Sequence, residues 1–309
     1  MPSVNTITTV AAENKTFYDR KLLKRMLPSL HLYNDGQKRK LKERNGTTID
    51  FRKFNSLSVP TNSLTEGTTP TGSTLNVTNL TATVKQEGDY IGISDMLQKA
   101  GIDEVKSEST DILSEQAALT IDTRIRTALL LGTNISYANG KTSSTLTKTD
   151  VITEADIKKL ARKLKKQNAI KFPDGYYHAV VSPDQAYDIT NLTGYTDIGK
   201  YVNGTQLLKG EIGKMHGIRF MESTNVATAI VGTGDNAFTK HIAMVYGAES
   251  YGVVELEGNG KPEMIFKGLG SGGTEDPLNQ RATSAWKACF TAKILQPECF
   301  IKFETAVSA

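Results

Sequence analysis

Apolar residues recur at helical spacing along residues 103–131, with charged residues on the other faces. The stripe is formed by Val105, Ile112, Leu113, Ile121, Ile125 and Leu129. Asp103 or the Ser94–Asp95 pair can cap the start, and Gly132 is a suitable residue to end the run. The pattern predicts a helix about 43 Å long at 1.5 Å per residue, which is unusual for a compact enzyme.

The segment 47–94 shows a different pattern, that of a long and thin β-ribbon. Two β-type runs, 49–54 and 75–84, flank a tip rich in Thr, Ser, Pro and Gly, with turn formers at Pro60, Gly67 and Pro70. Such an arm would reach on the order of 60 Å, and an isolated two-stranded ribbon is marginally stable in water. The arm must therefore pack against another protein surface. If that surface belongs to another copy of the chain, the protein is an assembly subunit.

The rest of the chain mixes helices and strands. Residues 15–27 predict an N-terminal helix, and 151–257 predict an α/β unit with a helix capped by Thr153 and strands near 176–181, 218–220 and 243–246. Alternating runs between 263 and 303 predict further strands. The fold class is α+β.

Charge changes this picture only near the N-terminus. The 309 residues carry a net charge of +4, yet residues 1–53 hold twelve Lys or Arg against five Asp or Glu. The densest cluster comprises Lys38, Arg39, Lys40, Lys42 and Arg44. It predicts a surface that meets a polyanion or an acidic neighbour, although an ordinary solvated face explains it equally well.

Composition narrows the class of protein further. Mean hydropathy is −0.33, no apolar run approaches the roughly 18 residues of a membrane span, and the first residues do not form a secretory signal. Cys289 and Cys299 belong to no CxxC pair, so we interpret them as reduced thiols, with a disulfide between them as the alternative.

No motif in the sequence carries recognisable catalytic or cofactor chemistry. The four histidines stand apart from one another, and residues 210–215 lack the frame of a phosphate-binding P-loop. The glycine-rich run 268–273 is expected to be a bend before a strand. The prediction is a protein that is not an enzyme and needs no metal or cofactor.

Four segments resemble, in order and spacing, the major capsid proteins of tailed bacteriophages, in the group typified by N-four-type podoviruses. They are FYDRKLL (17–23), LTEGTTP (64–70), QEGDYIGISD (86–95) and GEIGKMHGIRF (210–220). The resemblance spans residues 17–256. It implies the Hong Kong 97-type capsid fold, with an N-terminal arm containing a basic helix (1–46), an E-loop (47–94), a spine helix with part of the peripheral domain (95–150), an axial domain (151–257) and C-terminal strands of the peripheral domain (258–309).

The resemblance also implies roles and partners. The E-loop of a capsid subunit lies over a neighbour, so the tip residues Leu64, Glu66, Gly67, Thr69 and Pro70 are candidate intersubunit contacts. The expected partners are the chain itself in hexamers and pentamers, scaffold and portal proteins, double-stranded DNA bound without sequence preference, and decoration proteins, but no membrane. Assembly is expected in the host bacterial cytoplasm, and the final location is the virion capsid. The first matching motif lies close to Met1, so the scaffold is expected to be a separate protein.

Three other hypotheses remain open at this point. An encapsulin-like shell would share the fold and hold protein cargo instead of DNA. A tail or decoration protein could also use a protruding arm. An enzyme with an α/β domain is the third, because catalytic residues distant in sequence can converge in space.

Overall fold

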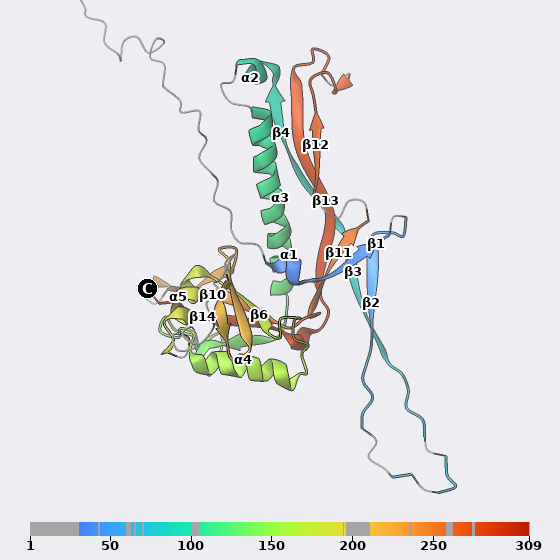
Figure 1. The fold of residues 1–309 in the computed structure, drawn as a ribbon, viewed down its shortest axis with the longest axis vertical. Coiled ribbons are helices and arrows are strands. Elements are labelled where there is room, and N and C mark those ends of the chain that lie inside the picture. The colour runs from blue at the N-terminus through green and yellow to red at the C-terminus, as the bar shows by residue number, and fades with distance from the viewer. Residues whose placement is uncertain are drawn as a thin grey trace, which may run out of the picture.

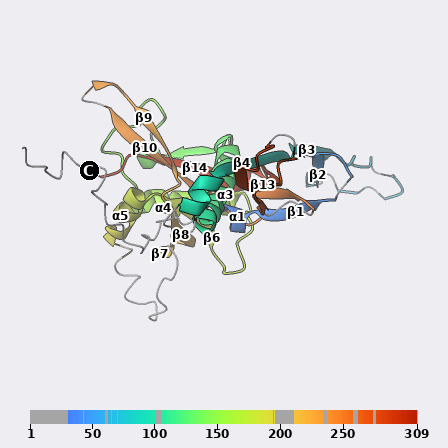
Figure 2. The same ribbon diagram turned by 90° about the horizontal axis from the view of Figure 1, so that it is seen from above.

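A computed structural model describes residues 31–42, 44–59, 63–64, 66–69, 71–100, 105–193, 195, 211–234, 237–257, 262–273 and 276–308. The predicted helix at 15–27, the motif at 17–23, Pro70 and the Asp103 cap lie outside these ranges. Figure 1 shows a long helix beside long strands, a rounder part at one end and a thin hairpin that projects away from both. In Figure 2 the hairpin and the rounder part lie at opposite ends of the molecule.

The described residues build three sheets. A five-stranded sheet contains β1 (Gln37–Leu41), β11 (Tyr251–Leu256), β13 (Arg281–Ile294), β12 (Glu263–Lys267) and β4 (Lys85–Ser94). A seven-stranded sheet contains β5 (Ile135–Tyr137), β14 (Phe300–Thr305), β10 (Phe238–Tyr246), β6 (Tyr177–Val181), β8 (Ile218–Glu222), β7 (Glu211–Met215) and β9 (Ala227–Val231). β2 (Thr48–Phe54) and β3 (Val77–Thr83) form the hairpin.

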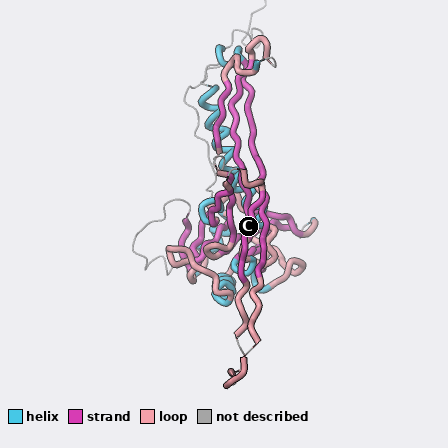
Figure 3. The backbone as a smooth tube through the Cα atoms, turned by 90° about the vertical axis from the view of Figure 1, so that its right-hand side faces the viewer, coloured by secondary structure: helices cyan, strands magenta, loops and turns pink. Residues whose placement is uncertain are grey.

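The long strand β13 organises the five-stranded sheet. β4 pairs with one edge of β13, whereas β12 and β11 follow one another along the other edge. β1 adds to β11 in parallel and forms one end of the sheet. Figure 3 shows these strands running side by side along the helix. The predicted strands near 263 and 281 are confirmed as β12 and β13.

The long helix α3 (Val105–Leu130) has 26 residues, slightly fewer than predicted, and packs on this sheet. Leu113, Ile121, Ile125 and Leu129 of the predicted face are buried. The side chain of Val105 is outside what the structure describes.

Ile112 was predicted to lie on this face, and that prediction is wrong, because its side chain is 42% exposed. Successive buried positions follow one another at i+4 from Leu113, so the stripe drifts by about 40° a step around the helix. Ile112 lies about 100° from Leu113 in the opposite direction. A drifting stripe is what packing against a twisted strand requires.

The substitution Ile125→Val is expected to lower the free energy of unfolding by about 0.5–1.5 kcal/mol, because it deletes a methyl group from a fully buried site. The matched substitution Ile112→Val deletes the same group from an exposed site, so we expect a change within about 0.5 kcal/mol. Urea titration of both variants measures the difference. Equal losses would contradict the observed face of α3.

The seven-stranded sheet lies between two layers. One face packs against α4 (Glu154–Lys166) and α5 (Pro183–Thr190). The other face packs against α3 and the short helix α1 (Leu32–Asp35). The short helix α2 (Asp95–Ala100) follows β4 directly. The predicted strands near 176, 218 and 243 are confirmed as β6, β8 and β10.

The last strand differs from the prediction. β14 was grouped with the other C-terminal strands, yet it pairs with β10 and β5 in the seven-stranded sheet. Its side chains Phe300, Ile301 and Phe303 are buried there. An apolar run of this kind predicts a strand, but its partner depends on contacts with residues more than 50 positions away, which no local pattern reports.

The helices α4 and α5, which cover one face of the seven-stranded sheet, each begin after an N-cap residue. The Thr153 hydroxyl accepts a hydrogen bond from the Asp156 backbone N–H at 3.3 Å, which confirms the predicted cap of α4. Ser182 and Gln185 form a full capping box at the start of α5. Gln185 also donates to the Thr305 hydroxyl at 2.8 Å, which ties α5 to β14.

Candidate assembly interface

The hairpin is a shorter ribbon than the sequence predicted. β2 and β3 pair in register from Thr48↔Thr83 to Phe54↔Val77. Residues 85–94, predicted to belong to the same arm, instead form β4 and pair with β13 along the spine. Both segments have extended character, so the local pattern could not distinguish a free ribbon from a strand within a sheet.

The base of the hairpin is anchored to its own subunit. Ile49, Phe51 and Val84 pack against Leu41 and Val254 on one face of the five-stranded sheet. Across the hairpin, the Thr81 hydroxyl donates to the Asp50 carboxylate at 2.6 Å. These contacts fix the direction in which the rest of the hairpin leaves the molecule.

Beyond this base the hairpin presents apolar side chains to solvent. The exposed fractions are 65% for Phe54, 55% for Leu57, 84% for Val59, 78% for Leu64, 71% for Leu75 and 46% for Val77. We call these six residues the hairpin apolar set. Exposed apolar residues gathered on one projecting element indicate a surface that another molecule covers. The hairpin apolar set is therefore the best candidate for an assembly contact in the described chain.

The predicted tip residues lie at the far end of this hairpin. Leu64, Glu66, Gly67 and Thr69 are exposed, and Pro70 lies outside the described residues. Gly67 has φ of +78°, a left-handed conformation that favours glycine in a turn. The sequence and the exposed side chains thus point to the same element, although the sequence analysis named only Leu64 from the hairpin apolar set.

The predicted basic residues lie elsewhere, on and after β1. Lys38, Arg39, Lys40, Lys42 and Arg44 are all exposed. Because side chains alternate along a strand, Lys38 and Lys40 point to the face opposite Arg39. Lys38 Nζ lies 4.1 Å from the centre of the Tyr33 ring, whereas Arg39 lines a groove against β2. The three cations of β1 therefore do not form one surface.

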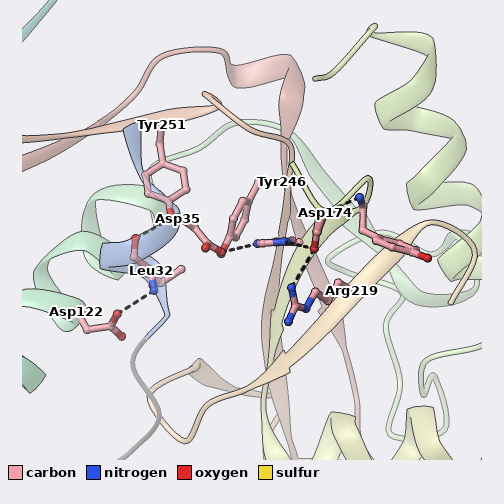
Figure 4. A network of polar contacts seen from close by, with 9 residues as sticks. Leu32, Asp35, Asp122, Asp174, Arg219, Tyr246 and Tyr251 are labelled. Atoms are coloured by element: carbon pink, nitrogen blue, oxygen red, sulfur yellow. Dashed lines mark hydrogen bonds and ion pairs between the residues drawn. The ribbon is translucent and has the colours of Figure 1, made fainter. Parts of the chain in front are cut away.

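A partly buried polar junction that the sequence analysis missed joins α1 to the five-stranded and seven-stranded sheets (Figure 4). The Asp35 carboxylate accepts a hydrogen bond from the Tyr246 hydroxyl at 2.8 Å and lies 2.8 Å from His178 Nδ1. His178 Nε2 lies 3.1 Å from Asp174, which also accepts from Arg219 at 3.0 Å. This arrangement connects α1 with strands β6, β8 and β10.

The same short helix is also tied to α3 and β11. The Leu32 backbone N–H donates to the Asp122 carboxylate at 3.2 Å, and the Tyr251 hydroxyl donates to the Leu32 carbonyl at 2.7 Å. Asp35 and His178 are 143 positions apart in the chain. No spacing in the sequence predicts this contact, and a single histidine without a motif around it does not indicate a site.

The junction shifts the protonation of its members. Burial alone would lower the pKa of His178, but the hydrogen bonds and negative charges of Asp35 and Asp174 raise it overall. Burial opposes ionisation of Asp174, yet its hydrogen bonds from Tyr176, His178 and Arg219 hold its pKa below the ordinary value. His178 and Asp174 thus stabilise each other in their charged forms.

His241 behaves in the opposite way. Its Nδ1 lies 2.7 Å from the Ser182 hydroxyl at the start of α5, and burial lowers its pKa. Ser182 is itself buried, and its oxygen accepts the capping hydrogen bond from the Gln185 backbone N–H at 3.2 Å. The contact therefore holds the beginning of α5 against β10.

Two searches of the described chain bear on other kinds of site. No helix among the described residues is long and apolar enough to cross a membrane. Within the same ranges, no group of three or more His, Cys, Asp or Glu side chains is placed to hold a metal ion. Both Cys289 and Cys299 are buried free thiols.

Solved structures with this architecture come from phage capsids. The capsid structure of cyanophage P-SCSP1u has a TM-score of 0.70 and 16% identity, with 97% of this chain and 95% of that chain covered. The capsid of Ralstonia phage GP4 has a TM-score of 0.72 and 13% identity, with 99% of both chains covered. The acid-stable capsid of Helicobacter pylori bacteriophage KHP30 has a TM-score of 0.70 and 13% identity, with 98% of both chains covered.

These likenesses show that the chain has the Hong Kong 97-type capsid fold. No curated protein sequence matches the chain, and the predicted N-four-type podovirus group stays a prediction. The sequence model of a family described as phage capsid protein matches residues 77–303, well over half of the 309 residues. The chain therefore belongs to the phage capsid protein family and is a structural protein of the phage capsid.

Proposed function

We propose that copies of this chain assemble in rings of five and six into a closed icosahedral shell around double-stranded DNA, and that the hairpin of each copy lies over a neighbouring copy. The observation that carries this proposal is the hairpin apolar set. Its side chains protrude from an element that its own subunit supports only at the base. A ribbon with this composition is stable only when another surface covers it.

The hairpin suits head-to-tail contacts. A projecting element on one part of a subunit that binds a different part of the next generates a ring when the rotation closes. Several such contacts per subunit allow each to stay modest in strength while the closed shell is stable. Scaffold and portal proteins, decoration proteins and assembly in the host bacterial cytoplasm belong to the same proposal.

The genome contact is a separate part of the proposal. Residues Lys38, Arg39, Lys40, Lys42 and Arg44 are exposed cations that can neutralise phosphate without reading base sequence. Their distribution over two faces of β1 limits how many of them one duplex can contact.

Negative-stain electron microscopy of the full chain, expressed in bacteria with and without a co-expressed scaffold, tests the shell. We expect closed shells or rings of five and six, and nuclease treatment followed by extraction should recover protected DNA from phage-derived shells. Shells filled with protein would support the encapsulin-like alternative instead. Monomers under both conditions would contradict the proposal.

A further inference from the structure

The outer surface of the seven-stranded sheet carries a basic stripe that no part of the sequence analysis singled out. α4 contains six Lys or Arg residues and two carboxylates, so this one helix accounts for a charge of +4, equal to the net charge of the whole chain. The exposed cations are Lys158, Lys159, Arg162, Lys165 and Lys166. We call these five residues the α4 basic stripe.

The stripe lies on one side of the helix. At about 100° per residue its five side chains fall within an arc of about 120° and along about 12 Å of the axis. The opposite side consists of Ile157, Leu160, Ala161 and Leu164, which are buried against the sheet. The stripe therefore faces away from the sheet, at the lower edge of the rounder part in Figure 1, and on the face of the sheet opposite to α3.

Few carboxylates in the described chain neutralise this stripe. Lys158 lies 2.6 Å from Glu154, and Lys159 lies 3.3 Å from Asp156, both in the first turn of α4. No salt bridge from any described residue reaches Arg162, Lys165 or Lys166. The free positive charge thus increases toward the end of the helix.

Two ordinary explanations account for only part of the stripe. Cations in the last turn of a helix favourably oppose the partial negative charge of its C-terminus, which covers Lys165 and Lys166. An amphipathic helix also needs polar residues on its solvent-facing side. Residues of either charge would meet that need, so it does not explain why every exposed charge beyond the first turn of α4 is positive.

The composition of the stripe identifies the chemistry of its partner. Protein–protein interfaces are depleted in lysine at their centres, whereas Lys and Arg supply most contacts to phosphates. Five cations over about 12 Å approach the linear charge density of a DNA duplex, one negative charge per about 1.7 Å of axis. We propose that the α4 basic stripe is the main surface through which this chain contacts the phosphate backbone of duplex DNA.

This inference rests on the proposed function, because it identifies where the enclosed DNA touches the subunit. The contact carries no sequence preference, since the stripe offers cations and no set of side chains arranged to read base edges. It also differs from the contact predicted at β1, where the cations are divided between two faces.

The experiment compares unassembled full-length chains for binding of a fluorescent 30-base-pair duplex between about 50 and 200 mM salt. The test variant replaces all five stripe residues by Gln, which keeps helix propensity. Each lost phosphate contact reduces the slope of log K against log salt by about 0.9. We expect the slope to fall by about 3 to 4, and the affinity at the lowest salt concentration to fall by at least about 100-fold.

The matched comparison removes the same number of charges from Lys38, Arg39, Lys40, Lys42 and Arg44. Because the cations of β1 are divided between two faces, the slope of this variant should fall by only about 1 to 2. A second control replaces Lys158, Lys159, Lys165 and Lys166 by Arg, which should keep the slope. If circular dichroism shows that the Gln variant is unfolded, the single substitutions Lys158→Glu, Arg162→Glu and Lys166→Glu should each weaken binding more than Lys38→Glu does.

An unchanged slope in the α4 variant, or an equal loss in the β1 variant, would overturn the inference. Tighter binding of the parent chain to poly-glutamate than to the duplex would also overturn it, in favour of an acidic protein partner. Microscopy of the same preparations separates this result from the proposed function. Shells formed with an unchanged slope contradict only the stripe, whereas a parent chain that never forms shells contradicts the proposed assembly.

Discussion

A chain in which Leu57, Val59, Leu64 and Leu75 are replaced by Ser is expected to fold like the parent chain and to form no shells. These side chains are 55–84% exposed in the subunit, so their loss removes almost no intramolecular burial. Covering each one at a contact contributes about 1.5–3 kcal/mol. Losing about 6 kcal/mol per hairpin weakens each contact by on the order of 10⁴-fold.

Sedimentation velocity and electron microscopy measure the loss of shells, and thermal unfolding measures the integrity of the subunit. The melting temperature should change by less than about 2 °C. A control with Leu57, Leu64 and Leu75 replaced by Met and Val59 by Ile keeps the apolar character of the hairpin and should still form shells. Shells at the parental yield from the Ser variant would show that the hairpin does not hold the assembly together.

Deletion of the tip tests the far end of the hairpin separately, because it removes Leu64 and Leu75 but keeps Leu57 and Val59. Removing residues 61–76 shortens the loop but leaves all of the paired strand residues, because Phe54 pairs with Val77 at the end of the ribbon. The base contacts of Ile49 and Phe51 with the five-stranded sheet also remain. We expect soluble subunits without shells, which would locate the assembly contact in the tip rather than in the anchored base.

Local periodicity predicted the elements of this fold well. The helix α3, the hairpin and the strands β6, β8, β10 and β13 all follow from patterns that extend over a few residues. Helical spacing also identified Leu113, Ile121, Ile125 and Leu129 as buried. The error at Ile112 has a physical reason, since a straight stripe cannot represent a helix that follows a twisted sheet.

The same local patterns could not predict which distant segments pair with one another. Residues 85–94 and 300–305 both show extended character, but which strand pairs with each one is decided by contacts across the whole chain. The basic residues illustrate the same limit. Charge density pointed to residues 38–44, whereas the amphipathic geometry of α4 places five exposed cations on one surface.

The polar junction at Asp35 could not be predicted from the sequence. Its removal is expected to have the largest effect on the stability of the subunit. In the variant Asp35→Ala, the Tyr246 hydroxyl loses the acceptor at 2.8 Å and His178 loses one of its two carboxylates. Removing one partner of a fully buried charged pair costs about 3–5 kcal/mol. Because Asp35 is only partly buried, we expect a loss of about 2–3 kcal/mol. Substitution of the exposed Asp111 by Ala should cost less than about 0.5 kcal/mol.

The same junction predicts how stability depends on pH. The pKa of His178 is raised above its ordinary value of 6.5 in the folded chain. Its contribution is therefore fully present below pH 6.5 and is lost as pH rises through the raised value. The lowered pKa of His241 acts in the opposite sense, because that contribution is present above pH 6.5 and is lost as pH falls.

Because the two histidines oppose each other, the difference between the parent chain and the variant His178→Gln isolates the junction. Urea unfolding between about pH 6 and pH 9 should show that the advantage of the parent chain decreases as pH rises. The same comparison can be made between two chains that both carry Asp35→Asn, one with His178 and one with His178→Gln. There the stabilisation by His178 should be lost at a lower pH than in the parent chain, because one of the two negative charges that hold the proton on His178 is gone. An advantage that is constant across this range would mean that His178 does not titrate between the two carboxylates, and that the junction stabilises α1 through neutral hydrogen bonds alone.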